Sequence, residues 1–244
     1  MQTLKQILKE ISIQPPGSCL VVFDLDSTLF DLAIRVTAIL DRYARSAENQ
    51  MRFPRECEAL KRIEIRKGDW GLTEPLERLG IRSDSNAEFV KDVQSAWARG
   101  FFSNEFLKHD LPLPGAVQFV TDVIGYGAHV IYLTGRDIPR MEAGTKQSLI
   151  DTGFPLNDVS ARMVLKPTQG LDDALFKADE IESYQNRYQQ IWLFENEPVN
   201  INAVAKRCPK VKMVFVDTCH SGLEEVHASI SKIPHFEIAL SEFE

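Results

Sequence analysis

Short apolar runs alternate along most of the chain with longer segments whose apolar residues recur at helical spacing. Each run has the length of a strand and is apolar at nearly every position, which is typical of strands buried on both faces of a sheet. The runs span 19–23, 129–133, 161–165, 190–194 and 210–216. The helical patterns span 1–12, 116–125, 138–151, 171–187 and 223–232. This order predicts an α/β fold with a doubly wound, mostly parallel sheet and right-handed crossovers.

The alternation is interrupted between the first run and the second. The interval 33–110 carries helical patterns at 32–47, 55–67 and 85–100 but no strand pattern. Gly68 is expected to end the second of these helices, and Ser85 with Glu88 has the spacing of a capping box at the start of the third. We therefore expect an α/β core domain, 1–32 and 111–244, and a helical domain, 33–110. The last segment, 233–244, is either a tail or an edge strand.

The segment 35–67 carries nine basic and five acidic residues in a chain whose net charge is −7. This local excess either attracts anionic substrates or belongs to a solvated helix face. The acidic balance of the whole chain argues against nucleic-acid binding through a basic surface.

The first run ends in Asp24 and Asp26, two carboxylates separated by one residue, and Thr28 follows. Open α/β sheets bind ligands at the carboxyl ends of strands, where the strand order switches. A buried strand that ends in two negative charges needs a positive partner, and a divalent metal is the simplest one. One carboxylate can accept a phosphoryl group covalently, and a second within reach can donate and accept protons. The alternative is an Asp-rich turn without chemistry.

The segment from Asp24 to Thr28 resembles the first motif of the haloacid dehalogenase (HAD) superfamily, which is Asp-x-Asp-x-Thr or Val after an apolar strand. The resemblance implies a Rossmann-like sheet with a helical cap domain inserted after this motif. It also implies that Asp24 is the nucleophile and forms an aspartyl-phosphate, and that Asp26 is the general acid/base. Dehalogenating members lack the second Asp because a halide leaves without a proton, so Asp26 favours phosphoryl transfer. Helices that only pack, without covering the site, are the alternative to a cap.

The segment from Thr134 to Arg136 resembles the second HAD motif, an apolar strand that ends in Thr or Ser. The resemblance implies that the Thr134 hydroxyl binds a phosphoryl oxygen. Gly135 allows backbone N–H groups to approach the anion closely. Arg136 either reaches the substrate or pairs with a carboxylate.

The third HAD motif is a lysine that offsets the charge of the nucleophile and the phosphoryl group. Lys166, at the end of a strand, and Lys177, in the helix before the strand at 190–194, are the two candidates. The family usually places its lysine in that helix, which favours Lys177.

The fourth HAD motif is normally an acidic pair that binds magnesium, and Glu195-Asn196 occupies its position. The resemblance implies that Mg²⁺ is bound by Asp24, Asp26 and Glu195 with Asn196. Both side chains offer oxygen ligands, which Mg²⁺ prefers. Which of Glu195 and Asn196 is the direct ligand is left open.

Together the motifs imply a magnesium-dependent phosphatase that hydrolyses a small phosphorylated metabolite. Two alternatives remain: a phosphomutase or phosphotransferase that uses the same residues, and a metabolite-binding pseudoenzyme, which the unusual Glu195-Asn196 pair suggests. The sequence names neither the substrate nor the oligomeric state.

The four cysteines form no Cys-x-x-Cys pair and are expected to be free thiols in a reducing compartment. No apolar run has the length of a membrane span. The segment 1–12 is amphipathic and lacks the unbroken apolar stretch of a secretory signal. We therefore expect a cytoplasmic protein with no membrane partner.

Overall fold

The computed structural model of this chain describes residues 3–238. The core elements are α1 (Leu4–Ser12), β1 (Cys19–Phe23), α7 (Ala116–Gly125), β4 (His129–Asp137), α8 (Ile138–Asp151), β5 (Ala161–Lys166), α9 (Asp173–Tyr184), β6 (Gln190–Glu195), α10 (Pro198–Arg207), β7 (Lys212–Val216) and β8 (Ser231–Ile233). Between β1 and α7 lie β2 (Phe30–Asp31), α2 (Ala33–Arg45), α3 (Ala47–Arg52), α4 (Pro54–Leu60), α5 (Thr73–Arg78), α6 (Ala87–Phe101), the 3₁₀ helix η1 (Asn104–His109) and β3 (Leu111–Pro112).

Within residues 3–238, six strands form one sheet in the order β5-β4-β1-β6-β7-β8, and every neighbouring pair is parallel. The predicted α/β class and parallel sheet are confirmed. Strand β1 is central, and Val22 pairs with Ile131 of β4 and Leu193 of β6. The strand order reverses around β1, so its carboxyl end lies at the switch point where such sheets bind ligands.

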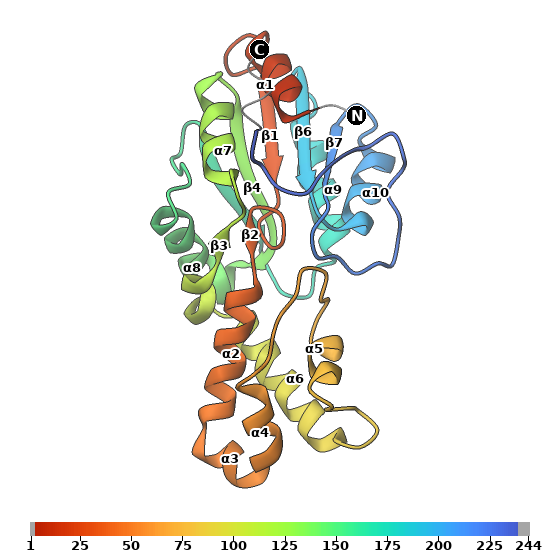
Figure 1. The fold of residues 1–244 in the computed structure, drawn as a ribbon. Helices are drawn as coiled ribbons and strands as arrows, with labels where there is room; N and C mark the ends of the chain where they lie inside the picture. The colour runs from red at the N-terminus through yellow and green to blue at the C-terminus, as the bar shows by residue number, and fades with distance from the viewer. Residues whose placement is uncertain (1–2, 239–244) are drawn as a thin grey trace.

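Both faces of β1 are buried, as its continuous apolar run predicted. Val21 and Phe23 pack toward α1 and α7, whereas Leu20 and Val22 pack toward α9 and α10. Figure 1 shows these helix pairs on opposite faces of the sheet. No helix within residues 3–238 is both long enough and apolar enough to cross a membrane.

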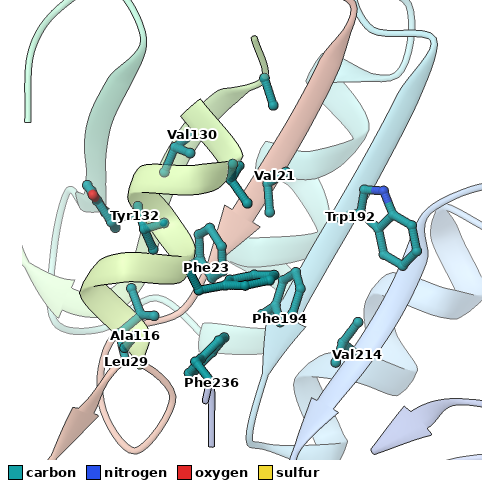
Figure 2. Packing of buried hydrophobic residues seen from close by; sticks show 14 of the residues in the cluster. Val21, Phe23, Leu29, Ala116, Val130, Tyr132, Trp192, Phe194, Val214 and Phe236 are labelled. Carbon is teal, nitrogen blue, oxygen red and sulfur yellow. The ribbon is translucent and has the colours of Figure 1, made fainter. Parts of the chain in front are cut away.

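An aromatic cluster supports the strand ends that carry the candidate site. The rings of Phe23 and Phe194 stack at 4.8 Å between centroids, and Phe119 and Phe236 pack against both. Figure 2 shows Phe23, Phe194 and Phe236 meeting beside the sheet. Phe23 directly precedes Asp24, and Phe194 directly precedes Glu195. The stacked rings therefore hold the two acidic positions at a fixed separation.

The helical insertion leaves and rejoins the core through a short antiparallel pair, in which Phe30 faces Pro112 and Asp31 faces Leu111. Its helices share an apolar cluster of their own, which includes Leu40, Phe89 and Val93. Figure 1 shows the insertion extending beyond the carboxyl ends of the sheet strands. The division into two domains at 33 and 110 stays a prediction.

Three local predictions were wrong. The expected helix 223–232 is absent; this stretch forms turns and then β8, whose residues pair with the edge of β7. Helix α4 ends at Leu60, and the residues up to Gly71 form a loop that reaches the core, where the Cys219 thiol donates to the Asp69 carbonyl at 3.0 Å. In both places pairing with distant chain outweighs local helical spacing.

The third wrong prediction is the capping box formed by Ser85 and Glu88. Helix α6 begins after Asn86 without a side-chain cap, and Ser85 donates to the Asn86 side chain instead. Of the last segment, 233–244, only Ile233 belongs to a strand, because β8 ends there and residues 234–238 form bends and irregular chain. Residues 239–244 lie outside the described residues.

Candidate active site

A buried lysine joins the ends of the two central strands. Lys177 of α9 places its Nζ 2.7 Å from Asp24 Oδ1 and 2.6 Å from Glu195 Oε2. All three residues are nearly inaccessible to solvent. The pairing of Phe23 with Phe194 puts Asp24 and Glu195 side by side, and α9 crosses behind them. Of the two lysine candidates, only Lys177 contacts these carboxylates, because Lys166 pairs with Asp173 and the Leu171 carbonyl.

Burial is the largest cause of the shifted pKa of Asp24. It raises the pKa of the Asp24 carboxyl to about 7, against the opposing effect of Lys177 and with a further increase from Glu195. Burial of Lys177 disfavours its own charge, but the two carboxylates outweigh it and raise its pKa. The lysine is therefore a permanent cation at this site, and it supplies the charge that lets Asp24 ionise in a buried place.

Asp26 points into a different group of charges. Its Oδ1 accepts hydrogen bonds from Arg35 at 2.9 Å and from Arg136 at 2.5 Å. Asp110 lies against the same two arginines, 2.7 Å from Arg136 Nη2 and 3.2 Å from Arg35 Nε. Burial alone would raise the pKa of Asp26, but the two guanidinium groups hold it well below its usual range. In this arrangement Asp26 is ionised, and it becomes an effective base only after it moves away from at least one guanidinium.

Two members of this group, Arg35 and Asp110, were not among the predicted site residues. They lie 75 residues apart, at the beginning and end of the insertion, and no local pattern connects them. From the sequence, Arg35 was recognised only as one of the basic residues in the segment 35–67. The sequence left two alternatives for Arg136, a contact with the substrate or a pair with a carboxylate. In the structure Arg136 pairs with the carboxylates of Asp26 and Asp110. Only the tertiary fold brings the four charged residues together.

Replacement of Arg35 by Met should destabilise the protein by about 3–5 kcal/mol, because the buried Asp110 and the partly buried Asp26 would then share one guanidinium. Arg42→Met is the matched control, since Arg42 is on the same helix and its pair with Glu105 is exposed. That change should alter the free energy of unfolding by less than about 1 kcal/mol. Urea denaturation measures both values, and equal effects of the two substitutions would contradict a buried network.

Asn196 makes hydrogen bonds that an aspartate could not make in full. Thr28 Oγ1 donates to Asn196 Oδ1 at 2.9 Å, and Asn196 Nδ2 donates to the Cys219 carbonyl at 2.5 Å. The amide group thus ties the first motif to the segment after β7. Glu195 Oε1 accepts the backbone N–H groups of Asn196 and Glu197, at 3.1 and 3.0 Å.

Thr134 and Gly135 lie near the carboxyl end of β4, where its regular pairing with β5 ends. Because β4 is parallel to its neighbour β1, they lie at the same end of the sheet as Asp24. The Thr134 hydroxyl accepts the backbone N–H of Arg136 at 3.3 Å, and no hydrogen bond from Thr134 to Asp24 or Asp26 appears among the described residues. At Gly135 a Cβ atom would overlap the carboxylate of Asp173. The absence of a side chain at Gly135 therefore leaves room for Asp173 at the start of α9. It also leaves the backbone N–H of Gly135 unshielded.

The residues around Asp24 offer only oxygen ligands to a metal. Asp24 and Glu195 are carboxylates, Asn196 is a carboxamide, and Asp26 adds a backbone carbonyl. Across residues 3–238 no three His, Cys, Asp or Glu side chains form a metal-binding group. Mg²⁺ is commonly held by one or two carboxylates, with waters and substrate phosphate completing its shell. The donors present fit that mode of binding and do not form an all-protein cage.

Comparison with known proteins supports the fold assignment. No protein-family model and no curated protein matches the sequence. Among solved structures, a protein from Burkholderia xenovorans LB400 described as a haloacid dehalogenase-like hydrolase is 16% identical, with 91% of this chain and 94% of that chain covered and a TM-score of 0.52. A protein from Clostridium difficile described as a phosphatase is 14% identical, with 86% and 90% covered and a TM-score of 0.51.

These similarities cover the sheet and the insertion together. At such identities they establish the fold and leave the activity to the chemistry of the site. The parallel sheet of this chain and its helical insertion thus form a haloacid dehalogenase-like fold.

Proposed function

We propose that this protein is a magnesium-dependent phosphatase that hydrolyses a phosphomonoester through an aspartyl-phosphate. The observation that carries the proposal is the buried contact of Lys177 with both Asp24 and Glu195 at the carboxyl end of the central strand. A buried aspartate beside a permanent cation that favours its ionised form, at the switch point of the sheet, is suited to attack a phosphoryl group. Burying the three charged side chains of Asp24, Lys177 and Glu195 costs free energy, which a turn with only a structural role could avoid.

In the first half-reaction an oxygen of Asp24 forms a bond to phosphorus, and the bond from phosphorus to the alcohol oxygen breaks. Asp26 gives its proton to that oxygen, so it must first be protonated and loosened from at least one of its two arginines. Lys177 and the hydroxyl of Thr134 hold the phosphoryl oxygens.

In the second half-reaction Asp26 accepts a proton from water, and the water oxygen bonds to phosphorus as the acyl-phosphate bond breaks. Inorganic phosphate leaves, and Asp24 is restored. For this step Asp26 must again leave at least one of its two arginines, because the pairing that lowers its pKa also makes it a weak base.

Asp24, the Asp26 carbonyl, Glu195 and Asn196 would hold the magnesium ion. When bound, the ion neutralises phosphoryl charge and orients the group for in-line attack. Glu195 already accepts hydrogen bonds at both carboxylate oxygens, and Asn196 Oδ1 accepts one from Thr28. Asp24 is therefore the principal carboxylate ligand in this proposal.

Phosphate release from p-nitrophenyl phosphate and a panel of phosphorylated metabolites, with and without Mg²⁺, tests the proposal. We expect hydrolysis that requires Mg²⁺ and stops with EDTA. Release of free phosphate without an added acceptor distinguishes a phosphatase from a phosphotransferase. Absence of Mg²⁺-stimulated release across the panel would leave the pseudoenzyme alternative.

A further inference from the structure

A cavity of about 450 Å³ lies between the core and the helical insertion, next to the candidate active site. Ser27, the neighbour of Asp26, forms part of its wall. Cys219 forms another part, and its carbonyl accepts the hydrogen bond from Asn196. Ser27 of the first motif thus belongs to the cavity wall, and Asn196 of the fourth motif is hydrogen-bonded to the wall residue Cys219. Its volume is that of a pocket for a small organic molecule.

Most of the cavity wall is apolar. It is built from β2, the first turn of α2, the end of α6 and the loop that follows α4 (Figure 1). Five aromatic side chains contribute to it: Phe30, Trp70, Trp97, Phe101 and Phe102. Trp70 is 53% exposed at the rim, so a ligand ring placed against it would remove apolar surface from water.

Several polar groups of the wall already have partners. Asp69 pairs with Arg78, the Asp31 carboxylate accepts the backbone N–H of Ala33, and the Thr218 hydroxyl donates to the Ser27 carbonyl. The remaining polar side chains of the wall are Ser27, Arg66, Lys67 and His235, of which Arg66 and Lys67 are exposed and Arg66 pairs with Glu64. The accessible surface of the wall is therefore mainly apolar, with the charges of Arg66 and Lys67 exposed to solvent.

Trp97 contributes to this wall, and its indole N–H is buried with no hydrogen-bond partner within residues 3–238. A wall with several rings and few polar groups suits a ligand that has a ring, since apolar walls of this kind select such ligands.

From these walls we propose that the alcohol released at Asp24 is apolar and aromatic and occupies this cavity. The inference rests on the proposed phosphatase function and specifies its substrate class. The phosphoryl group is bound at Asp24 and Lys177, and the alcohol extends past Ser27 to lie among Trp70, Trp97 and Phe102.

The test compares two esters of primary alcohols, 2-(1-naphthyl)ethyl phosphate and glucose 6-phosphate, so that the reactivity of the leaving groups is similar. We expect kcat/KM to be at least about 10-fold higher for the naphthyl ester, as burial of one ring predicts. Trp97→Ala and Trp70→Ala should each lower this preference several-fold, mainly through KM. Tyr126→Ala, which removes an exposed aromatic side chain just after the end of α7 and outside the cavity wall, should leave it unchanged.

A second measurement separates the two proposals. Binding of 2-(1-naphthyl)ethanol to the wild-type protein should change tryptophan fluorescence, and Trp70→Ala, which removes a half-exposed side chain and little packing, should weaken that binding. Hydrolysis of both esters with no preference and no binding of the alcohol would overturn the cavity assignment while the phosphatase function stands. Failure to hydrolyse any ester would overturn both.

Discussion

Asp24→Asn is expected to abolish phosphate release, with kcat reduced by at least about 10⁴-fold, the scale seen when a covalent nucleophile is removed. Asparagine has nearly the same shape, but its neutral amide cannot take the phosphoryl group as a carboxylate does. Lys177 keeps its contact with Glu195 in the variant, so the fold should persist. Initial rates with Mg²⁺, together with circular dichroism, measure the two effects.

The control is Asp151→Asn, a substitution of the same kind at the exposed end of α8, which should retain full activity. A stronger readout follows the covalent step itself. Wild-type protein quenched in acid during turnover of a ³²P-labelled ester should carry label on the chain, and the Asp24→Asn variant should carry none. Labelled variant protein would place the nucleophile elsewhere.

Lys177→Met is the second substitution with a large expected effect. It leaves Asp24 and Glu195 facing each other in a buried place without their shared cation, which should lower kcat by about 10²–10³-fold. The same loss should reduce the free energy of unfolding by about 3–5 kcal/mol near pH 7. Urea denaturation in EDTA measures the stability, and steady-state kinetics with Mg²⁺ measure the rate.

The stability loss of this variant should depend on pH in a defined direction. Burial and the Glu195 charge raise the pKa of Asp24, and Lys177 opposes them. Without Lys177 the pKa of Asp24 in the folded variant lies further above its value in the unfolded chain, so the folded state binds more protons. The variant therefore becomes less stable as pH rises from about 4 through that raised value, and its deficit relative to wild type shrinks toward pH 4. A deficit independent of pH would mean that Lys177 acts through packing alone.

Lys166→Met is the matched control, because it removes the other lysine candidate. Lys166 pairs with Asp173, whose side chain is half exposed, and it does not touch Asp24. Activity should fall far less than in Lys177→Met. The reverse order of effects would assign the third motif to Lys166.

The charge group around Asp26 links the position of the insertion to the site. Arg35 belongs to the first turn of α2, and Asp110 lies just before β3, so both connections to the insertion end in this group. Arg136, in contrast, comes from the core strand β4. Any shift of α2 relative to β1 changes the contact between Arg35 and Asp26, and with it the charge around the proposed acid/base.

Much of the core could be predicted from the sequence. The run Cys19–Phe23 is apolar throughout because both faces of β1 are covered, so periodicity alone placed Asp24 and Asp26 at a strand end. The order of the later runs predicted the parallel sheet, whereas the choice of Lys177 over Lys166 came from the resemblance to the HAD motifs. These features depend on residues close together in the chain, where pattern and spacing carry the information.

Other features were decided only by the tertiary structure. Arg35, Asp110 and Arg136 meet Asp26 because three separate elements converge, and no spacing along the chain encodes that meeting. The stretch 223–232 has helical spacing but forms turns, and its last two residues, Ser231 and Lys232, pair with β7, since backbone hydrogen bonds to a neighbouring strand outweigh weak local preference. The cavity between insertion and core likewise exists only once both parts are folded together, because its walls come from segments far apart in sequence.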